Sequence, residues 1–95
     1  AGFDAHVADP LASCRVTEAG FALMTASLRR ACAEVGAPLG LVLEGGYSLE
    51  ALADSVVELM PVLSAAELPP PVDAGPVPRV DAARRHFARW WPDLT

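Results

Sequence analysis

"LGLVLEGGYS", residues 39–48, is the stretch from which the fold of this chain is predicted. Residues 39–43 form a short apolar run between proline and glycine signals. A strand that is apolar on both faces is typical of a parallel sheet covered by helices above and below. Gly45 and Gly46 end this strand, and Ser48 can cap a following helix. We therefore predict an α/β fold with a buried strand at residues 39–43.

Two amphipathic helices are predicted on either side of this strand. Thr17 is a suitable N-cap for the first, which ends at Gly36, and Ser48 caps the second, which Pro61 kinks or ends early. The apolar positions that predict a core-facing stripe are Phe21, Met24, Leu28 and Val35 in the first helix, and Leu49, Leu52, Val56, Leu59 and Leu63 in the second.

Two loops are expected to carry the chemistry. Residues 1–3 read as the end of another strand, so that residues 4–10 and 44–48 both follow strand ends, where doubly wound sheets bind ligands. This arrangement predicts that Asp4 and Tyr47 face one crevice, and that Gly45 and Gly46 let the backbone approach a ligand closely. Only one complete strand is visible, so the remaining strands are expected upstream.

The C-terminal third has a different composition. Residues 67–78 form a proline-rich connector that cannot bury a face. A last helix over residues 79–91 is predicted to place its aromatic side chains on one side and its arginines on the rest, and Pro92 stops it. We expect residues 79–95 to dock on the body of the protein and not to bind nucleic acid.

The composition narrows the possible partners and compartments. The 95 residues are 53% hydrophobic, enough for a buried core, and the net charge of -5 disfavours nucleic-acid and anionic-membrane surfaces. Two cysteines form neither a disulfide framework nor a zinc motif, which indicates a reducing compartment. No membrane span or signal peptide is visible, so we expect a cytoplasmic protein. The missing initiator methionine suggests a fragment.

Two motifs in order, "AGFDAHVADPL...VTEAGFALMT" and "LVLEGGYSLEALADSV", make the chain recognisable. They resemble the C-terminal part of zinc-dependent deacetylases of the histone deacetylase, acetylpolyamine amidohydrolase and acetoin-utilisation superfamily, most closely its class II-like branch. The resemblance covers about residues 1–65, and we expect residues 1–66 to form the C-terminal part of the catalytic domain. It implies the C-terminal portion of an open, mostly parallel arginase/deacetylase-like sheet with flanking helices.

The resemblance also implies roles for individual residues. The family's aspartate ligand of Zn²⁺ falls on Asp4, and the tyrosine that donates a hydrogen bond to the substrate carbonyl and its oxyanion falls on Tyr47. Zinc polarises an amide carbonyl, and a neutral phenol opposite the metal stabilises charge that develops in the transition state. Leu11 falls on a position that lines the substrate channel, and its lack of charge favours acetylated lysine over a polycation.

His6 and Asp9 are the alternatives within the first loop. Asp4-Ala5-His6 imitates the spacing of the family's upstream D-x-H ligands, but the surrounding residues match the later loop, in which the aspartate alone binds the metal. We therefore expect His6 to be a polar loop residue or a partner of a ligand, and Asp9 to brace the loop through backbone hydrogen bonds.

Two functions follow from these observations. In the first, the chain is part of a zinc-dependent amidohydrolase that deacetylates acetyl-lysine or a similar acetylated amine, and is inactive without the rest of the catalytic domain, which holds the other zinc ligands and a histidine pair. In the second, it is a truncated, non-catalytic deacetylase-like module that associates with another chain through exposed apolar faces.

Overall fold

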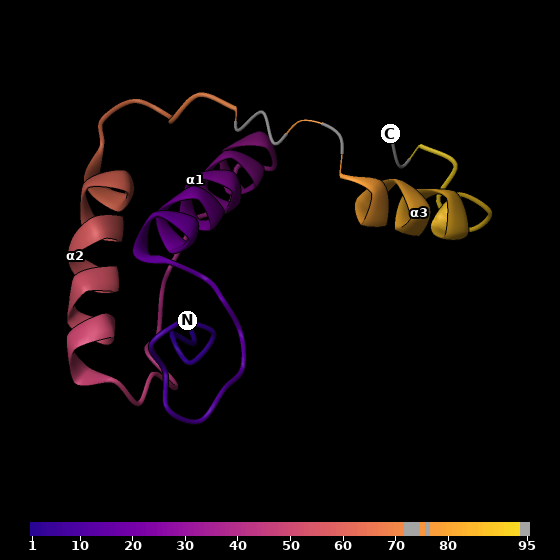
Figure 1. The fold of residues 1–95 in the computed structure, drawn as a ribbon. Coiled ribbons are helices and arrows are strands. Elements are labelled where there is room, and N and C mark those ends of the chain that lie inside the picture. Colours follow the sequence, from indigo (N-terminus) through magenta and orange to yellow (C-terminus); the bar gives the residue numbers. More distant parts are fainter. Residues whose placement is uncertain (72–74, 76, 94–95) are drawn as a thin grey trace.

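The computed structural model describes residues 1–71, 75 and 77–93, and this part of the chain holds three helices. They are α1 (Glu18–Glu34), α2 (Leu49–Ser64) and α3 (Pro78–Phe87). The first two pack side by side, and the N-terminal segment lies against them (Figure 1). α3 stands apart at the end of the proline-rich connector and packs against neither of the other helices.

The beginnings of α1 and α2 follow from their capping residues, as predicted. Thr17 accepts a hydrogen bond from the backbone N–H of Gly20 at 3.3 Å, and Ser48 accepts one from Ala51 at 3.4 Å. Each cap satisfies a backbone donor that the first helical turn leaves without a partner. Gly36, with a φ of 67°, follows the end of α1, which agrees with the glycine stop expected from the sequence.

Pro61 does not end α2, which continues to Ser64. The end of the helix is held from α1: the guanidinium of Arg29 donates to the carbonyl of Val62 at 2.5 Å and to that of Ala65 at 3.0 Å. These carbonyls lie where a helix has no internal donors left, so a cation from the neighbouring helix supplies them. Of the two effects expected of Pro61, a kink or an early end, the early end is therefore excluded.

The predicted α/β fold, with a mostly parallel sheet, is contradicted by the structure. Residues 39–43 are extended but belong to no strand, and across the described residues the β-structure consists of an isolated bridge between His6 and Val16. Beside this run, Glu44 donates to the carbonyl of Ala1 at 3.0 Å and the amino group of Ala1 donates to Val42. Apolar composition alone does not make a strand, because a ladder needs a neighbour along its whole length.

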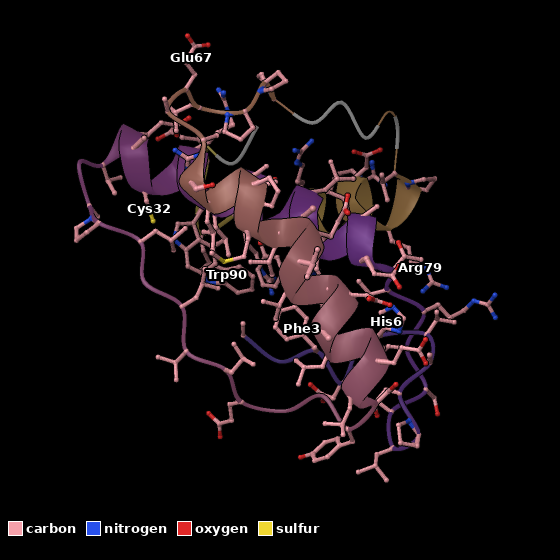
Figure 2. All side chains as sticks on the ribbon, turned by 90° about the vertical axis from the view of Figure 1, so that its left-hand side faces the viewer. Phe3, His6, Cys32, Glu67, Arg79 and Trp90 are labelled. Atoms are coloured by element: carbon pink, nitrogen blue, oxygen red, sulfur yellow. The ribbon has the colours of Figure 1, made fainter. Side chains whose placement is uncertain are left out.

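The core forms where the first loop meets the two long helices. Phe3, Phe21 and Leu59 are its buried apolar side chains, and the rings of Phe3 and Phe21 meet edge to face with centroids 4.8 Å apart. In Figure 2, Phe3 and His6 are seen on either side of α2. The half-buried residues packed against this core are Ala5, Val16, Leu52, Val56 and Leu63.

The two predicted apolar stripes have different outcomes. The stripe of α2 faces the core except at Leu49, which is 82% exposed. In α1 only Phe21 of the predicted stripe is buried, and Thr25 and Ala26 are buried with it. Met24 and Leu28 instead line an open cavity of about 550 Å³ shared with residues 39–42. Small side chains on the packed face let α1 approach α2 closely, so the larger residues lie to one side.

The connector touches the body of the protein at residues 69–71. The guanidinium of Arg30 donates to the carbonyl of Pro69 at 3.0 Å, and Pro69, Pro70 and Pro71 line one side of a groove between α1 and α2. The helix predicted over residues 79–91 ends at Phe87 and continues as turns. No helix in the described part of the chain is long and apolar enough to cross a membrane.

Replacing Gly46 with alanine should destabilise the fold more than the matched replacement of Gly36. A Cβ at Gly46, where φ is 107°, would lie 3.1 Å from the Cβ of Phe3, whereas a Cβ at Gly36 meets open space. We expect Gly36→Ala to cost about 1–2 kcal/mol through left-handed strain alone. Gly46→Ala should cost about 2–4 kcal/mol, because overpacking against the core adds to that strain. Urea unfolding followed by circular dichroism measures both costs, and equal values would contradict the prediction.

Candidate active site

Backbone hydrogen bonds fold the first loop against the start of α1. Within the loop, His6 donates to the carbonyl of Phe3 at 3.1 Å and Asp9 donates to that of His6 at 3.0 Å. Val7 donates to Val16 at 2.8 Å, and Val16 donates to Ala5 at 3.0 Å. The loop is therefore a closed turn tied to the chain that enters α1, and its side chains have defined positions.

His6 is a buried brace of this loop. Its ring is 4% exposed and stacks on Phe21, with centroids 6.3 Å apart. Nδ1 accepts a hydrogen bond from the N–H of Ala8 at 3.0 Å, which places the ring proton on Nε2. Nε2 faces Oε1 of Glu18 at 3.0 Å, although the direction of its N–H lies outside hydrogen-bond geometry. Both nitrogens thus face protein atoms, which supports a bracing role and leaves neither free for a metal.

Asp4 has a very different environment. Asp4 is half-buried, and its carboxylate lies between Gly2, which precedes the first loop, and Gly45 of the second: a Cβ on Gly2 would lie 2.7 Å from Oδ1 of Asp4, and a Cβ on Gly45 would lie 2.9 Å from the same atom. Among the described residues no group donates a hydrogen bond to this carboxylate or pairs with it. The glycines therefore make room for a carboxylate that accepts no hydrogen bond from the described residues.

Asp9 is the opposite case, an acidic side chain saturated by backbone donors. It is 8% exposed, and its Oδ1 accepts from the N–H groups of Leu11 at 2.9 Å and Ala12 at 3.1 Å. Its Oδ2 accepts from the N–H of Tyr47 at 2.8 Å. The predicted bracing of the first loop is confirmed. The bond to the second loop was not predicted, because sequence spacing does not indicate contacts across 38 residues.

The two predicted loops lie side by side, joined at Asp4 and at Asp9. Gly45 sits against the carboxylate of Asp4, Gly46 sits against Phe3 and Leu52, and both glycines have positive φ. The side chains of Tyr47 and Leu11 are 60% and 72% exposed. All of the predicted site residues thus lie in or beside these two loops, with Asp4 half-buried against Gly45 and the side chains of Tyr47 and Leu11 open to solvent.

One carboxylate does not make a metal centre. The part of the chain that the structure describes holds no group of three histidine, cysteine or acidic side chains that could bind a metal ion. Catalytic zinc sites use three protein ligands and keep a further position open. The donor chemistry of Asp4 fits a single ligand, so these residues on their own do not complete the zinc site expected from the sequence.

The electrostatics of the loop agree with its hydrogen bonds. The N–H of Tyr47, together with those of Leu11 and Ala12, holds the pKa of Asp9 below its ordinary value of 3.8, against the opposing effect of burial. The pKa of Glu18 is also below its ordinary value of 4.5, because of its own backbone N–H and the contact with His6. Both carboxylates are ionised near neutral pH, and both attach the first loop to its surroundings.

Acid should weaken the hydrogen bonds by which the carboxylate of Asp9 joins the two loops. Since the pKa of Asp9 is lower in the folded chain than 3.8, the unfolded chain binds more protons between the two pKa values, and the free energy of unfolding falls as the pH falls through them. Above about pH 5 the contribution is complete. Urea unfolding from about pH 2 to about pH 6 should show the gap between wild type and Asp9→Asn closing in acid. A gap independent of pH would contradict this.

Comparisons with known proteins place these loops in a family. The family described as "Histone deacetylase domain" matches residues 1–63. Histone deacetylase 5 of Arabidopsis thaliana is 33% identical over 99 residues, which cover 99% of this chain and 14% of that protein. Chloroplastic histone deacetylase 10 of Oryza sativa subsp. japonica is 44% identical over 59 residues, or 61% of this chain and 13% of that protein.

A probable deacetylase of Methanothermobacter thermautotrophicus is 41% identical over 70 residues, which cover 74% of this chain and 20% of that protein. No solved structure matches the chain significantly. The chain thus spans only 13–14% of the length of the two plant relatives. The match over residues 1–63 includes both loops and both long helices, and by it the chain belongs to the histone deacetylase family.

Proposed function

We propose that this chain forms part of the catalytic domain of a zinc-dependent deacetylase, in which its two loops make one wall of the active site. The observation that carries this proposal is the contrast between the two acidic residues of the first loop. Asp9 is saturated by three backbone N–H groups, whereas Asp4 has no partner among the described residues and lies against Gly45. A half-buried carboxylate without a partner is suited to bind a cation supplied with the rest of the site.

Asp4 is proposed as one of the ligands of Zn²⁺. Its Oδ1 occupies space that a Cβ on Gly2 or Gly45 would take, so the chain keeps that space for an acceptor oxygen. Bound zinc would polarise the acetyl carbonyl and lower the pKa of its water. The other ligands and the general base are proposed to come from the remainder of the catalytic domain, which we take to be the main partner of this chain.

Tyr47 is proposed as the catalytic residue of this chain. Its phenol is 60% exposed and follows two glycines that have positive φ. In the assembled site the phenol would donate a hydrogen bond to the acetyl carbonyl, and this bond would strengthen as negative charge develops on the oxygen. A donor aimed at the transition state raises the turnover number more than it raises the affinity for substrate.

The proposed substrate is acetyl-lysine or a similar acetylated amine. Leu11 is 72% exposed beside these loops and would line the channel, where it offers apolar contact but no countercharge for a polyamine. Gly45 and Gly46 would let the backbone approach the acyl group. The free cysteines Cys14 and Cys32 are compatible with the reducing cytoplasm in which we propose that the protein works.

Exposed apolar side chains indicate where the remainder of the domain would pack. Leu43 is 56% exposed, Val42 is 77% exposed and both lie in the extended run before the glycines. We propose that this face, together with the aromatic side chains near the end of α3, docks on that remainder. The same exposed surface would serve the second candidate, a non-catalytic module that binds another chain.

Replacing Tyr47 with phenylalanine should lower the turnover number of the full-length protein on an acetyl-lysine peptide by about 10²–10³-fold, as expected for the loss of one oxyanion donor. The KM should change little, because the hydrogen bond is strongest in the transition state. Steady-state kinetics measure both constants, with zinc content determined as the control for an intact metal site. An unchanged turnover number would remove Tyr47 from the mechanism and favour the non-catalytic module.

The 95-residue chain on its own should bind zinc weakly and show no deacetylase activity. Asp4 supplies a single carboxylate, and the described residues hold no cluster that could complete the coordination. Calorimetric titration of the purified chain with zinc, alongside the full-length protein, measures the difference. Tight binding of one zinc ion per chain that Asp4→Ala abolishes would contradict the prediction.

A further inference from the structure

The carboxylate of Asp9 joins the backbones of both loops in a single set of hydrogen bonds. Oδ1 holds the first loop through the N–H groups of Leu11 at 2.9 Å and Ala12 at 3.1 Å. Oδ2 reaches the second loop through the N–H of Tyr47 at 2.8 Å. Leu11 and Tyr47 are the two residues whose side chains we propose to contact the substrate. One buried anion therefore sets the backbone position of both.

Apart from Ser48, the next residue, which is anchored as the N-cap of α2, little else in the described structure fixes the position of Tyr47. Its side chain is 60% exposed, so packing does not hold the ring. The two preceding residues are Gly45 and Gly46, at φ values of 90° and 107°, and glycine has the most permissive backbone of all residues. Gly46 is restrained by contact with Phe3, but the contact ends one residue before the tyrosine. The bond from Asp9 is the restraint that acts on Tyr47 directly.

A purely local role for Asp9 would not use both of its oxygens in this way. An aspartate that only stabilises a turn accepts from the N–H groups two and three residues ahead, as Oδ1 does here. The bond from Oδ2 spans 38 residues of sequence. Charge-assisted hydrogen bonds of this kind are shorter and stronger than neutral ones, and burial at 8% exposure protects this one from competition by water.

We propose that Asp9 is a positioning residue, which holds Tyr47 at the reacting carbonyl by accepting a hydrogen bond from its backbone N–H. The inference rests on the proposed function, since it requires Tyr47 to be the oxyanion donor. Both oxygens of Asp9 are engaged by backbone N–H groups, so Asp9 would act through Tyr47 and not on the substrate. A donor displaced by about 1 Å can cost roughly 10²-fold in rate, so the loss of one backbone tie is expected to be visible in catalysis.

The test is a double-substitution cycle in the full-length protein, assayed with an acetyl-lysine peptide. Asp9→Asn keeps the shape of the side chain but replaces one acceptor oxygen with an amide that donates. It should lower the turnover number by roughly 10–100-fold with a nearly unchanged KM and full zinc content. In a Tyr47→Phe background the same change should cost less than about threefold, because the phenol that Asp9 positions is already absent.

Two further variants distinguish a positioning role of Asp9 from a general loss of structure. Asp54→Asn is the matched control, since Asp54 is an exposed acidic residue of α2 with no partner among the described residues, and it should leave the turnover number unchanged. Asp9→Glu keeps the charge but lengthens the side chain, so it should recover part of the rate. Amide hydrogen exchange provides a readout besides activity: the N–H of Tyr47 should exchange faster in Asp9→Asn than in wild type.

The outcomes distinguish the inference from the function on which it rests. If Tyr47→Phe lowers the turnover number but Asp9→Asn does not, the inference is overturned and the proposed function stands. If the costs of Asp9→Asn and Tyr47→Phe multiply, Asp9 acts independently of the phenol and the inference is again overturned. If Tyr47→Phe has no effect, both fail. Where Asp9→Asn does not fold, the Asp9→Glu cycle decides in the same way.

Discussion

The burial of Phe3 between α1 and α2 is the constraint on which the rest of the structure depends. The ring meets Phe21 edge to face and is packed with Leu59, and so joins the N-terminal segment to both long helices. The residue after it is Asp4, and Gly46 lies against its backbone and Cβ. One buried side chain therefore contacts both long helices and the second loop, which lies about 40 residues further along the sequence. Burying a phenylalanine supplies about 1.5–3 kcal/mol, enough to matter in so small a core.

The acidic residues around this contact divide into structural and available groups. Glu18 and Asp9 are engaged, one by His6 and the other by three backbone N–H groups, and both have lowered pKa values. Asp4 lies in space that Gly2 and Gly45 leave open, and it has no partner of its own in the described chain. The engaged carboxylates give the loop its shape, and Asp4 is the one that we propose as a metal ligand.

Local chemistry accounts for the parts of the fold that could be predicted. The starts of α1 and α2 were correct because a cap depends on one side chain and a donor three residues away. The stripe of α2 was largely correct because helical periodicity selects one face. The strand at residues 39–43 was wrong because apolar composition does not provide the neighbour that a ladder requires. The stripe of α1 failed because small residues occupy the packed face.

The sequence by itself determined the family, the identity of the two loops and the candidate roles of Asp4 and Tyr47, because these depend on residue types at fixed local spacing. Only the tertiary structure decided that His6 is a brace, that Asp4 is left without a partner and that Asp9 reaches Tyr47. The bond from Asp9 to Tyr47 spans 38 residues of sequence, and the ring of His6 is buried against Phe21 and Glu18 of α1. Such contacts are set by packing around Phe3, which no local pattern of residues encodes.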